Sequence, residues 1–516
     1  MSSHWIELFP SLILTLLFFV YGFNHYYLMM AARTYKSPVL PSGNHFRPAV
    51  CIHLPIYNES YVVERLVNAC VDMAECYGVD KVRILILDDS DDDTAHVVDQ
   101  VVHAYRERQP RIEVLHRDRR DGFKAGALQA ALLETHEDFI AIFDADFLPP
   151  PDFLNRTIPY FDEDPHLGMI QCRWAHLNRD YNFLTRAIAL GIDVHFLIEQ
   201  TGRYSAGHLQ NFNGSGGVLR TSSVLEAGGW ETDTLAEDLD VSYRIQIGGY
   251  GLLFLRDLQS PGEIPLTVPS FKRQQGRWAC GSLRTARKLL PDLIRDQRLT
   301  WQTRLQAVIH LTAYLLHPLM LCAFLLICGL TLGGLNFGTL PHFTNSFKGA
   351  LTWSLLVSTA VLFIQFMAWS VCIALIALCA VAPWISAAWA LKEQHLSVWR
   401  NLVSLMVLFL LGYGVSLSNS IEAGKALLTN RDWAFSRTPK YAVALDRVDW
   451  KTSKYQVPLN FVWIMELALV VLGVIAIAIA MERANFGILL FLAPYTAAYA
   501  FVASLTILQS RNEKRA

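Results

Sequence analysis

Long uncharged stretches lie at both ends of the chain, and between them lies a region with the mixed polar and apolar pattern of a globular protein. The first stretch, about Leu8 to Met30, is longer than the apolar core of a signal peptide and has no basic segment before it. Six later stretches approach the roughly 20 residues of a membrane helix. They lie at Leu305–Leu332, Leu351–Trp369, Cys372–Leu391, Leu402–Leu417, Val457–Ala480 and Phe486–Leu508. The pattern predicts seven membrane-spanning helices.

Residues 351–391 carry no charge, so they fit two spans joined by a tight turn or one span with a re-entrant segment. Two spans place the middle region, the basic segment from Glu422 to Lys454 and the basic tail on one face, as the positive-inside rule expects. We expect that face to be the cytoplasm. The chain is then a multi-pass protein of a plasma, inner or Golgi-type membrane.

Short β-branched runs alternate with helical stretches in the middle region. The predicted strands are Val50–Leu54, Val82–Leu87, Ile112–Leu115 and Phe139–Phe143. This alternation predicts an α/β domain with a mostly parallel sheet and helices on both faces. Ligands of such sheets bind beyond the carboxyl ends of the strands.

The predicted organisation has six parts. They are an N-terminal membrane helix (8–30), a cytosolic α/β domain (33–283), an interfacial amphipathic segment (284–304), membrane helices (305–417), a cytosolic loop (422–456) and C-terminal membrane helices (457–508). The amphipathic segment is expected because apolar and basic residues alternate there, as in helices that lie on a membrane surface.

The composition argues against nucleic-acid binding, a zinc site and a disulfide framework. The 516 residues are 53% hydrophobic with a net charge of -2, which argues against a nucleic-acid surface because phosphate contacts need a basic excess. The nine cysteines show no C-x-x-C spacing, which argues against a zinc site or a disulfide framework.

Two acidic clusters directly follow predicted strands. Asp88-Asp89 ends one strand, and Asp144-Ala145-Asp146 ends another. Asp89 can accept hydrogen bonds from a base or ribose, although a helix-capping role is the alternative. The D-x-D spacing suits a divalent ion, and we expect Asp146 to be the main ligand of Mg²⁺ or Mn²⁺, with Asp144 beside it.

Three further signals complete the predicted site. Lys124, between small residues at a helix start, can bring its ammonium and backbone N–H groups to a diphosphate. Glu237-Asp238 opens a predicted helix over Leu239–Ile247, where acids also simply favour the helix dipole. Gln274-Gln275-Gly276-Arg277-Trp278 has a spacing that core packing alone does not explain.

The order of these motifs resembles the family 2 glycosyltransferases with the Q-x-x-R-W signature, and most of all the cellulose-synthase-like A and C proteins. The resemblance implies a GT-A-type, Rossmann-like domain inserted in a transmembrane bundle. It also implies that Asp238 is the general base, with Glu237 beside it, although Ala236 stands where the family has Thr or Val. One base without a nucleophile implies inversion at the transferred sugar.

The resemblance assigns the remaining roles. The residues expected to bind the nucleotide sugar are Pro55, Tyr57, Glu59, Asp89, Lys124, Asp144, Gln274 and Arg277. Those expected at the acceptor are Trp278, Asn213, Gly214 and Trp174. The run from Phe435 to Lys440 resembles the family's gating loop, and Phe435, Thr438 and Lys440 are expected to close over the nucleotide.

The leading hypothesis is a polysaccharide synthase that extends a β-(1,4)-linked mannan or glucan from GDP-mannose or UDP-glucose and passes it across the membrane. The alternative is a transferase that adds one sugar to a membrane lipid such as ceramide or diacylglycerol. The expected partners are the donor, the growing β-glycan or lipid acceptor and the bilayer, with accessory secretion proteins as a further possibility and no nucleic acid.

Overall fold

The computed structural model describes residues 4–41, 46–106, 110–334, 378–429, 438–442 and 453–510. A seven-stranded sheet forms the centre of the α/β domain, in the order β3-β2-β1-β4-β6-β5-β7. Its strands are β1 (Val50–Ile56), β2 (Val82–Asp88), β3 (Arg111–His116), β4 (Phe139–Ile142), β5 (Leu167–His176), β6 (Gly217–Arg220) and β7 (Gly251–Gly262).

The sheet is mostly parallel. β1 pairs in parallel with β2 and β4, β2 with β3, and β5 with β7. Only β6, among the described strands, pairs antiparallel, with β4 and β5. β1, β2 and β4 are almost wholly buried, as expected for strands covered on both faces. The predicted α/β class and the four predicted strands are confirmed.

Helices cover both faces of the sheet. The core of one face contains residues of α2 (Val63–Tyr77), α3 (Thr94–Ala104), α5 (Phe153–Thr157) and α6 (Tyr160–Glu163). The core of the other contains residues of α4 (Phe123–Leu133), η1 (His195–Gln200), α9 (Thr221–Glu226) and α10 (Glu237–Ile247). The acidic clusters therefore lie at the carboxyl ends of strands fixed between two apolar layers.

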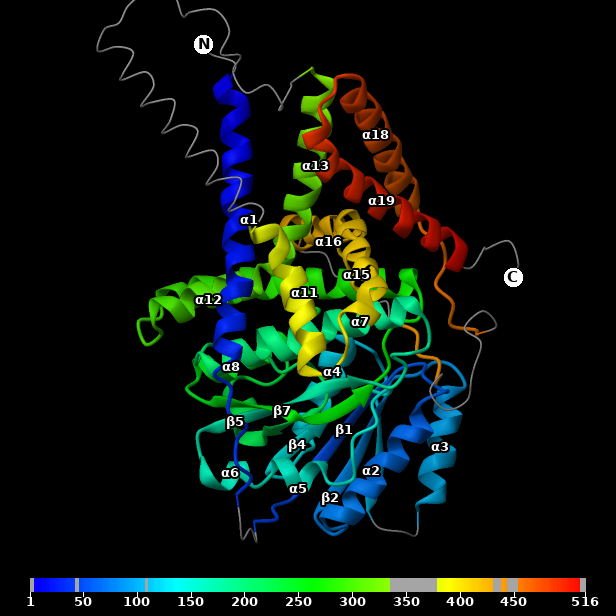
Figure 1. Cartoon of the computed structure of the whole chain (residues 1–516). Helices are drawn as coiled ribbons and strands as arrows, with labels where there is room; N and C mark the ends of the chain where they lie inside the picture. Colours follow the sequence, from blue (N-terminus) through cyan, green and yellow to red (C-terminus); the bar gives the residue numbers. More distant parts are fainter. Residues whose placement is uncertain are drawn as a thin grey trace, which may run out of the picture.

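The remaining helices form a frame on one side of this domain (Figure 1). They are α1 (His4–Ala32), α7 (Phe183–Val194), α8 (Thr201–Ser205), α11 (Val268–Arg295), α12 (Trp301–Leu311), η2 (Ala313–Leu315), α13 (Leu316–Leu332), η3 (Trp399–Asn401), α15 (Leu402–Gly414), α16 (Ser416–Leu428), α18 (Val462–Glu482) and α19 (Phe486–Gln509). A further helix covers 378–393.

Three of the described helices are long and apolar enough to cross a membrane: Ala313–Leu332, Val462–Glu482 and Phe486–Gln509. A fourth is added if Trp399–Gly414 and Ser416–Leu428, bent by 42°, form one broken span. Leu16–Ala32 is a shorter apolar helix. Residues 351–377 lie outside the described residues, so the count of seven stays a prediction.

Two predicted segments are divided differently in the structure. The stretch predicted over Leu305–Leu332 is split among α12, η2 and α13. Pro318, in the first turn of α13, lacks a backbone donor, and the Tyr21 hydroxyl of α1 donates to the Thr312 carbonyl at the break (3.1 Å). The segment 284–304 is shared by the end of α11 and the start of α12.

Helix α11 connects the sheet to the frame. It begins after β7, where the Thr267 side chain caps it by accepting from the Ser270 N–H. Farther along, Gly281 lies against the turn that precedes α10: an added Cβ would lie 2.6 Å from Ala236 Cβ and 2.8 Å from Ala236 N. Glycine is required here because backbone and helix approach too closely for a side chain.

We expect Gly281→Ala to lower the thermal stability of the detergent-solubilised protein, because overpacking of this kind typically costs about 1–3 kcal/mol. The matched control is Gly424→Ala, since a Cβ at Gly424 of α16 meets no atom within 4 Å. Differential scanning fluorimetry of both variants measures the difference. Equal melting temperatures would mean that α11 does not press on this turn.

Candidate active site

A pocket opens at the carboxyl ends of β1, β2 and β4, beside the starts of α10 and α11. It gathers nearly all the predicted site residues. Those lining it are Pro55, Tyr57, Glu59, Asp89, Lys124, Asp144, Asp146, Trp174, Asn213, Glu237, Asp238, Gln274, Arg277, Trp278, Thr438 and Lys440. Segments almost 400 residues apart along the chain thus meet in one hollow, and their individual roles remain predictions.

Among the described residues of the predicted site, one, Gly214, does not line the pocket. Gly214 lies behind it: its carbonyl accepts a hydrogen bond from Lys124 Nζ (2.9 Å), and a Cβ there would lie 2.7 Å from Asp238 Oδ2. Its φ of +79° also favours glycine. Phe435 lies outside the described residues.

The start of α10 presents two neighbouring acids, Glu237 and Asp238, and Lys124 faces them. Lys124 Nζ lies 2.6 Å from Asp144 Oδ1 and 3.6 Å from Glu237 Oε1. Burial opposes a charged lysine, but the surrounding carboxylates outweigh it and raise the pKa of Lys124. The ammonium is therefore fixed in its charged form between β4 and α10.

Asp238 has the protonation behaviour that a general base requires. Burial, followed by the neighbouring Glu237 charge, raises the pKa of Asp238 to about 7, while Lys124 opposes the rise. Its Oδ1 accepts the Leu239 N–H (2.8 Å), which fixes the side chain at the helix start. A carboxylate with a pKa near neutral can both take and hold a proton under ordinary conditions.

A lysine ammonium group pairs with each acid of the D-x-D motif. Asp146 Oδ2 accepts hydrogen bonds from Lys440 Nζ (2.5 Å) and from the Glu263 N–H (3.0 Å). Asp144 Oδ1 pairs with Lys124. Within the described part of the chain, Asp144 Oδ2 and Asp146 Oδ1 accept no hydrogen bond. Two carboxylate oxygens thus remain for a hard divalent cation, so the donor set fits Mg²⁺ or Mn²⁺.

Arg277 contacts Thr438, one of the predicted gating residues. Arg277 Nη2 donates to Thr438 Oγ1 (3.0 Å), which joins α11 to the segment 438–442. Gln274, one turn earlier on α11, is buried and lines the same pocket. Helix α11 thus contributes a guanidinium and an amide to the pocket that holds the acids.

Sequence reasoning missed three titratable residues of the pocket: Arg120, His176 and Glu263. The Arg120 guanidinium lies over the Tyr57 ring, 3.3 Å from its centroid. Arg117 holds Asp89, donating from Nε to Oδ1 at 3.0 Å. The basic run Arg117 to Arg120 was a usable signal, because it follows a strand and faces acids, whereas Glu263 is a single acid in no motif.

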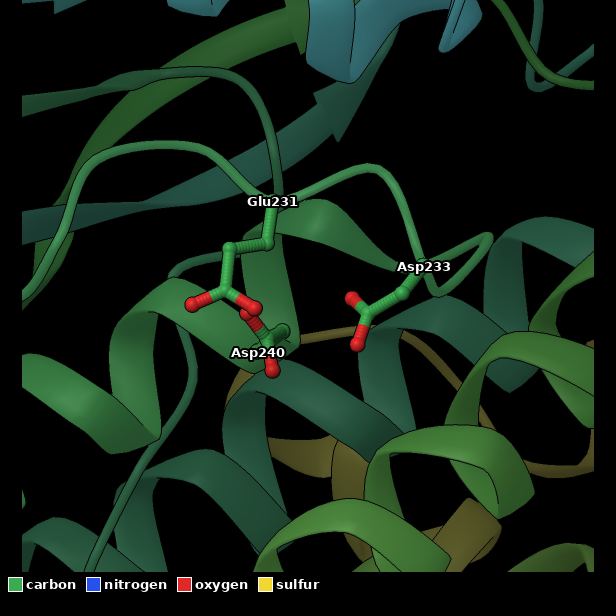
Figure 2. Close-up of side chains that lie close together, drawn as sticks. All are labelled: Glu231, Asp233 and Asp240. Atoms are coloured by element: carbon green, nitrogen blue, oxygen red, sulfur yellow. The ribbon is translucent and has the colours of Figure 1, made fainter.

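A second acidic group lies outside the pocket. Glu231, Asp233 and Asp240 lie within 4.8 Å of one another (Figure 2). Lys288 Nζ of α11 lies 2.5 Å from Glu231, 2.9 Å from Asp233 and 2.9 Å from Asp240. Arg244 also pairs with Asp240 (2.6 Å). Because these cations already neutralise the acids, the group is an ion-pair joint between α11 and α10.

Family models match most of the chain. The model for glycosyl transferase family group 2 matches residues 139–503, and that for glycosyl transferase family 2 matches residues 51–220. The predicted resemblance to family 2 glycosyltransferases and the predicted GT-A-type fold are thereby confirmed.

Two similar curated proteins come from plants. Probable glucomannan 4-beta-mannosyltransferase 9 of Oryza sativa subsp. japonica is 35% identical over 277 residues, which are 53% of this chain and 52% of the relative. Glucomannan 4-beta-mannosyltransferase 2 of Arabidopsis thaliana is 34% identical over 265 residues, 51% and 49% of the two chains. The chain spans about half the length of the curated relatives it matches.

Among solved structures, a mannosyltransferase of Pyrobaculum calidifontis in complex with GDP-Man and Mn²⁺ is similar in fold. The two chains are 20% identical with a TM-score of 0.49, and the match covers 72% of this chain and 97% of the other.

Asp238→Asn should retain nucleotide binding and lower turnover about 10²–10⁴-fold, because the amide cannot take a proton. In the unaltered protein, turnover with a nucleotide sugar should fall as pH decreases through about 7, since protonation of Asp238 removes the base. Steady-state rates across pH measure both effects.

Glu237→Gln is the matched variant for the same experiment. Removal of its negative charge lowers the pKa of Asp238, so the acidic limb of the profile should move to lower pH. If Glu237→Gln abolishes turnover and Asp238→Asn does not, Glu237 is the base.

Proposed function

The chain belongs to glycosyl transferase family group 2, and we propose that it transfers mannose from GDP-mannose to a growing β-(1,4)-linked polysaccharide and passes the product across a membrane. Both curated relatives are named as glucomannan 4-beta-mannosyltransferases, which favours mannose over the glucose of UDP-glucose. The observation that carries the proposal is Asp238, with its raised pKa, facing a hollow that also contains Lys124, the D-x-D pair and Arg277.

In the proposed complex, the nucleoside lies near Tyr57, Glu59 and Asp89, at the ends of β1 and β2. Its diphosphate extends toward Lys124 and Arg277, whose positive charges balance its negative charges. Asp144 and Asp146 would hold a divalent cation there. When bound, that cation neutralises charge on the leaving diphosphate.

The acceptor would enter beside Trp278, where the flat face of its terminal sugar can stack on the indole. Asp238 removes the proton of the attacking hydroxyl, the acceptor oxygen forms a bond to C1 of the donor sugar, and the bond from C1 to the diphosphate breaks. A single displacement inverts the configuration at C1, so an α-linked donor gives a β-linked product.

Passage of the product across the membrane rests on the position of the pocket. The pocket adjoins α11, and α11 contacts α16 of the helical frame, where Arg287 Nη1 donates to the Ala426 carbonyl (2.8 Å). A chain growing at Trp278 would therefore start beside the apolar helices.

The donor is tested by incubating membranes that contain the protein with GDP-mannose, UDP-glucose or UDP-N-acetylglucosamine separately. We expect GDP-mannose to give a long product that resists organic extraction and is cut by a β-mannanase. Trp278→Ala should lower both rate and chain length, because the indole would no longer hold the terminal sugar of the acceptor.

Two outcomes would contradict the proposal. A product made only from UDP-glucose and cut by a β-glucanase would mean that the donor is UDP-glucose and not GDP-mannose. A product that partitions into chloroform–methanol with one sugar on a lipid would replace the synthase by a lipid glycosyltransferase and leave the donor-site residues unchanged.

Chelation tests the divalent cation. EDTA should abolish transfer, and Mg²⁺ or Mn²⁺ should restore it, because the leaving diphosphate would otherwise face Asp144 and Asp146 without screening. Binding of Mn²⁺ to the purified protein, followed by electron paramagnetic resonance, should weaken in Asp146→Asn. Full activity in EDTA would exclude a required divalent ion.

A further inference from the structure

We propose that Glu263 is a positioning residue, which docks the segment 438–442 over the donor site and so sets the positions of Thr438 and Lys440. The docking itself is a property of the protein without substrate, so it does not depend on the proposed function. Only its expected effect on sugar transfer rests on that function. Glu263 follows the last residue of β7, in a stretch that matches no motif.

Four hydrogen bonds join this one residue to the segment and to the D-x-D pair. The Glu263 carboxylate accepts from the Tyr441 and Ala442 N–H groups through Oε2, at 3.2 Å each. Its carbonyl accepts from Lys440 Nζ (2.9 Å), and its N–H donates to Asp146 Oδ2 (3.0 Å). The side chain and the backbone of Glu263 thus both bind the segment 438–442, and the backbone also binds Asp146.

The Glu263 carboxylate is buried, and both of its oxygens have partners. Only 2% of the Glu263 side chain is exposed, and Arg65 of α2 pairs with its other oxygen, Oε1, at 3.0 Å. Arg65 Nη2 also donates to the Asp146 carbonyl (3.2 Å). Because an unpaired buried charge is costly, this full set of partners makes Glu263 a rigid receptor.

The docked segment is held in a conformation that it would not keep alone. Ala442 has a φ of +53°, in the left-handed region that an alanine rarely adopts. Ala442 is also buried in the apolar core on the face of the sheet that α2 covers. The neighbouring Tyr441 packs against Leu266. Tertiary contacts must therefore impose the conformation, and the N–H of Ala442 is one of the groups that Glu263 holds.

Docking reaches the donor site through two side chains. Lys440 lies against Asp146, and Thr438 accepts from Arg277. The hydrogen bonds from Glu263 to Tyr441 and Ala442 help to fix the backbone from which both side chains reach these partners. Glu263 therefore acts on transfer through the segment, without contacting the reacting atoms.

The first test is hydrogen–deuterium exchange on the full-length protein in nanodiscs without nucleotide. Glu263→Gln should speed exchange of the Tyr441 and Ala442 amides about tenfold or more, because their charged acceptor is lost. The matched control is Glu137→Gln, since Glu137 forms a similar ion pair with Arg83 (2.7 Å) far from this segment. Exchange at 441–442 that is unchanged in Glu263→Gln would overturn the proposal.

The second test separates docking from a general structural role. Transfer is measured for Glu263→Gln, Lys440→Ala and the double variant. If Glu263 acts through the segment, the double variant should be no slower than the slower single variant, whereas independent effects would multiply. Multiplying effects would overturn the proposal, and unaltered protein that transfers no sugar from any donor would instead refute the proposed function.

If Glu263→Gln does not fold, Tyr441→Ala is the alternative variant, because it removes the packing of the segment against Leu266. It should speed exchange at Ala442 and slow transfer, while exchange in α2 and β1 stays as in the unaltered protein. Unchanged exchange at Ala442 in that variant would overturn the proposal as well.

Discussion

The pocket depends on balancing a high density of negative charge. Asp144, Asp146, Glu237 and Asp238 all face one hollow, and like charges at such distances repel strongly when little water separates them. Their counterions come from other parts of the chain: Lys124 from α4, Arg277 from α11 and Lys440 from the segment 438–442. The acids can be brought together only if all three elements are in place, so folding of the sheet and assembly with the frame are coupled.

Helix α11 contacts both the pocket and the start of α10. Near its start it carries Gln274, Arg277 and Trp278, and Gly281 lies against the turn before α10. Lys288, about three turns beyond Arg277, is held by Glu231, Asp233 and Asp240. Because Gly281 and Lys288 both fix α11 against α10, Arg277 and Asp238 keep their relative positions on two separate helices. Glu231 and Asp233 are partly exposed, so these two pairs add little net stability.

Much of the fold could be predicted because β1, β2 and β4 are apolar runs that end close to polar or acidic residues. β7 could not, since Arg256, Asp257 and Pro261 interrupt its pattern and its pairing with β5 shifts register after Cys172. The pocket was predictable where motifs mark it. Glu263 was not, because its partners are defined only in space: Tyr441 lies 178 residues later in the sequence. Single-sequence patterns report local periodicity, and they contain no information on such pairings.

The position of the segment 438–442 has a mechanical consequence. In the sequence it lies between α16 and α18, and its hydrogen bonds go to Glu263 after β7, to Asp146 after β4 and to Arg277 of α11. Arg277 belongs to the helical frame and Asp146 follows a strand of the sheet, so a shift of α11 relative to the sheet would move the partners of Thr438 and Lys440 apart. The segment can therefore keep both contacts only while α11 and the strand ends hold their present spacing. Its position thus depends on the same packing of α11 against α10 that fixes Arg277 relative to Asp238.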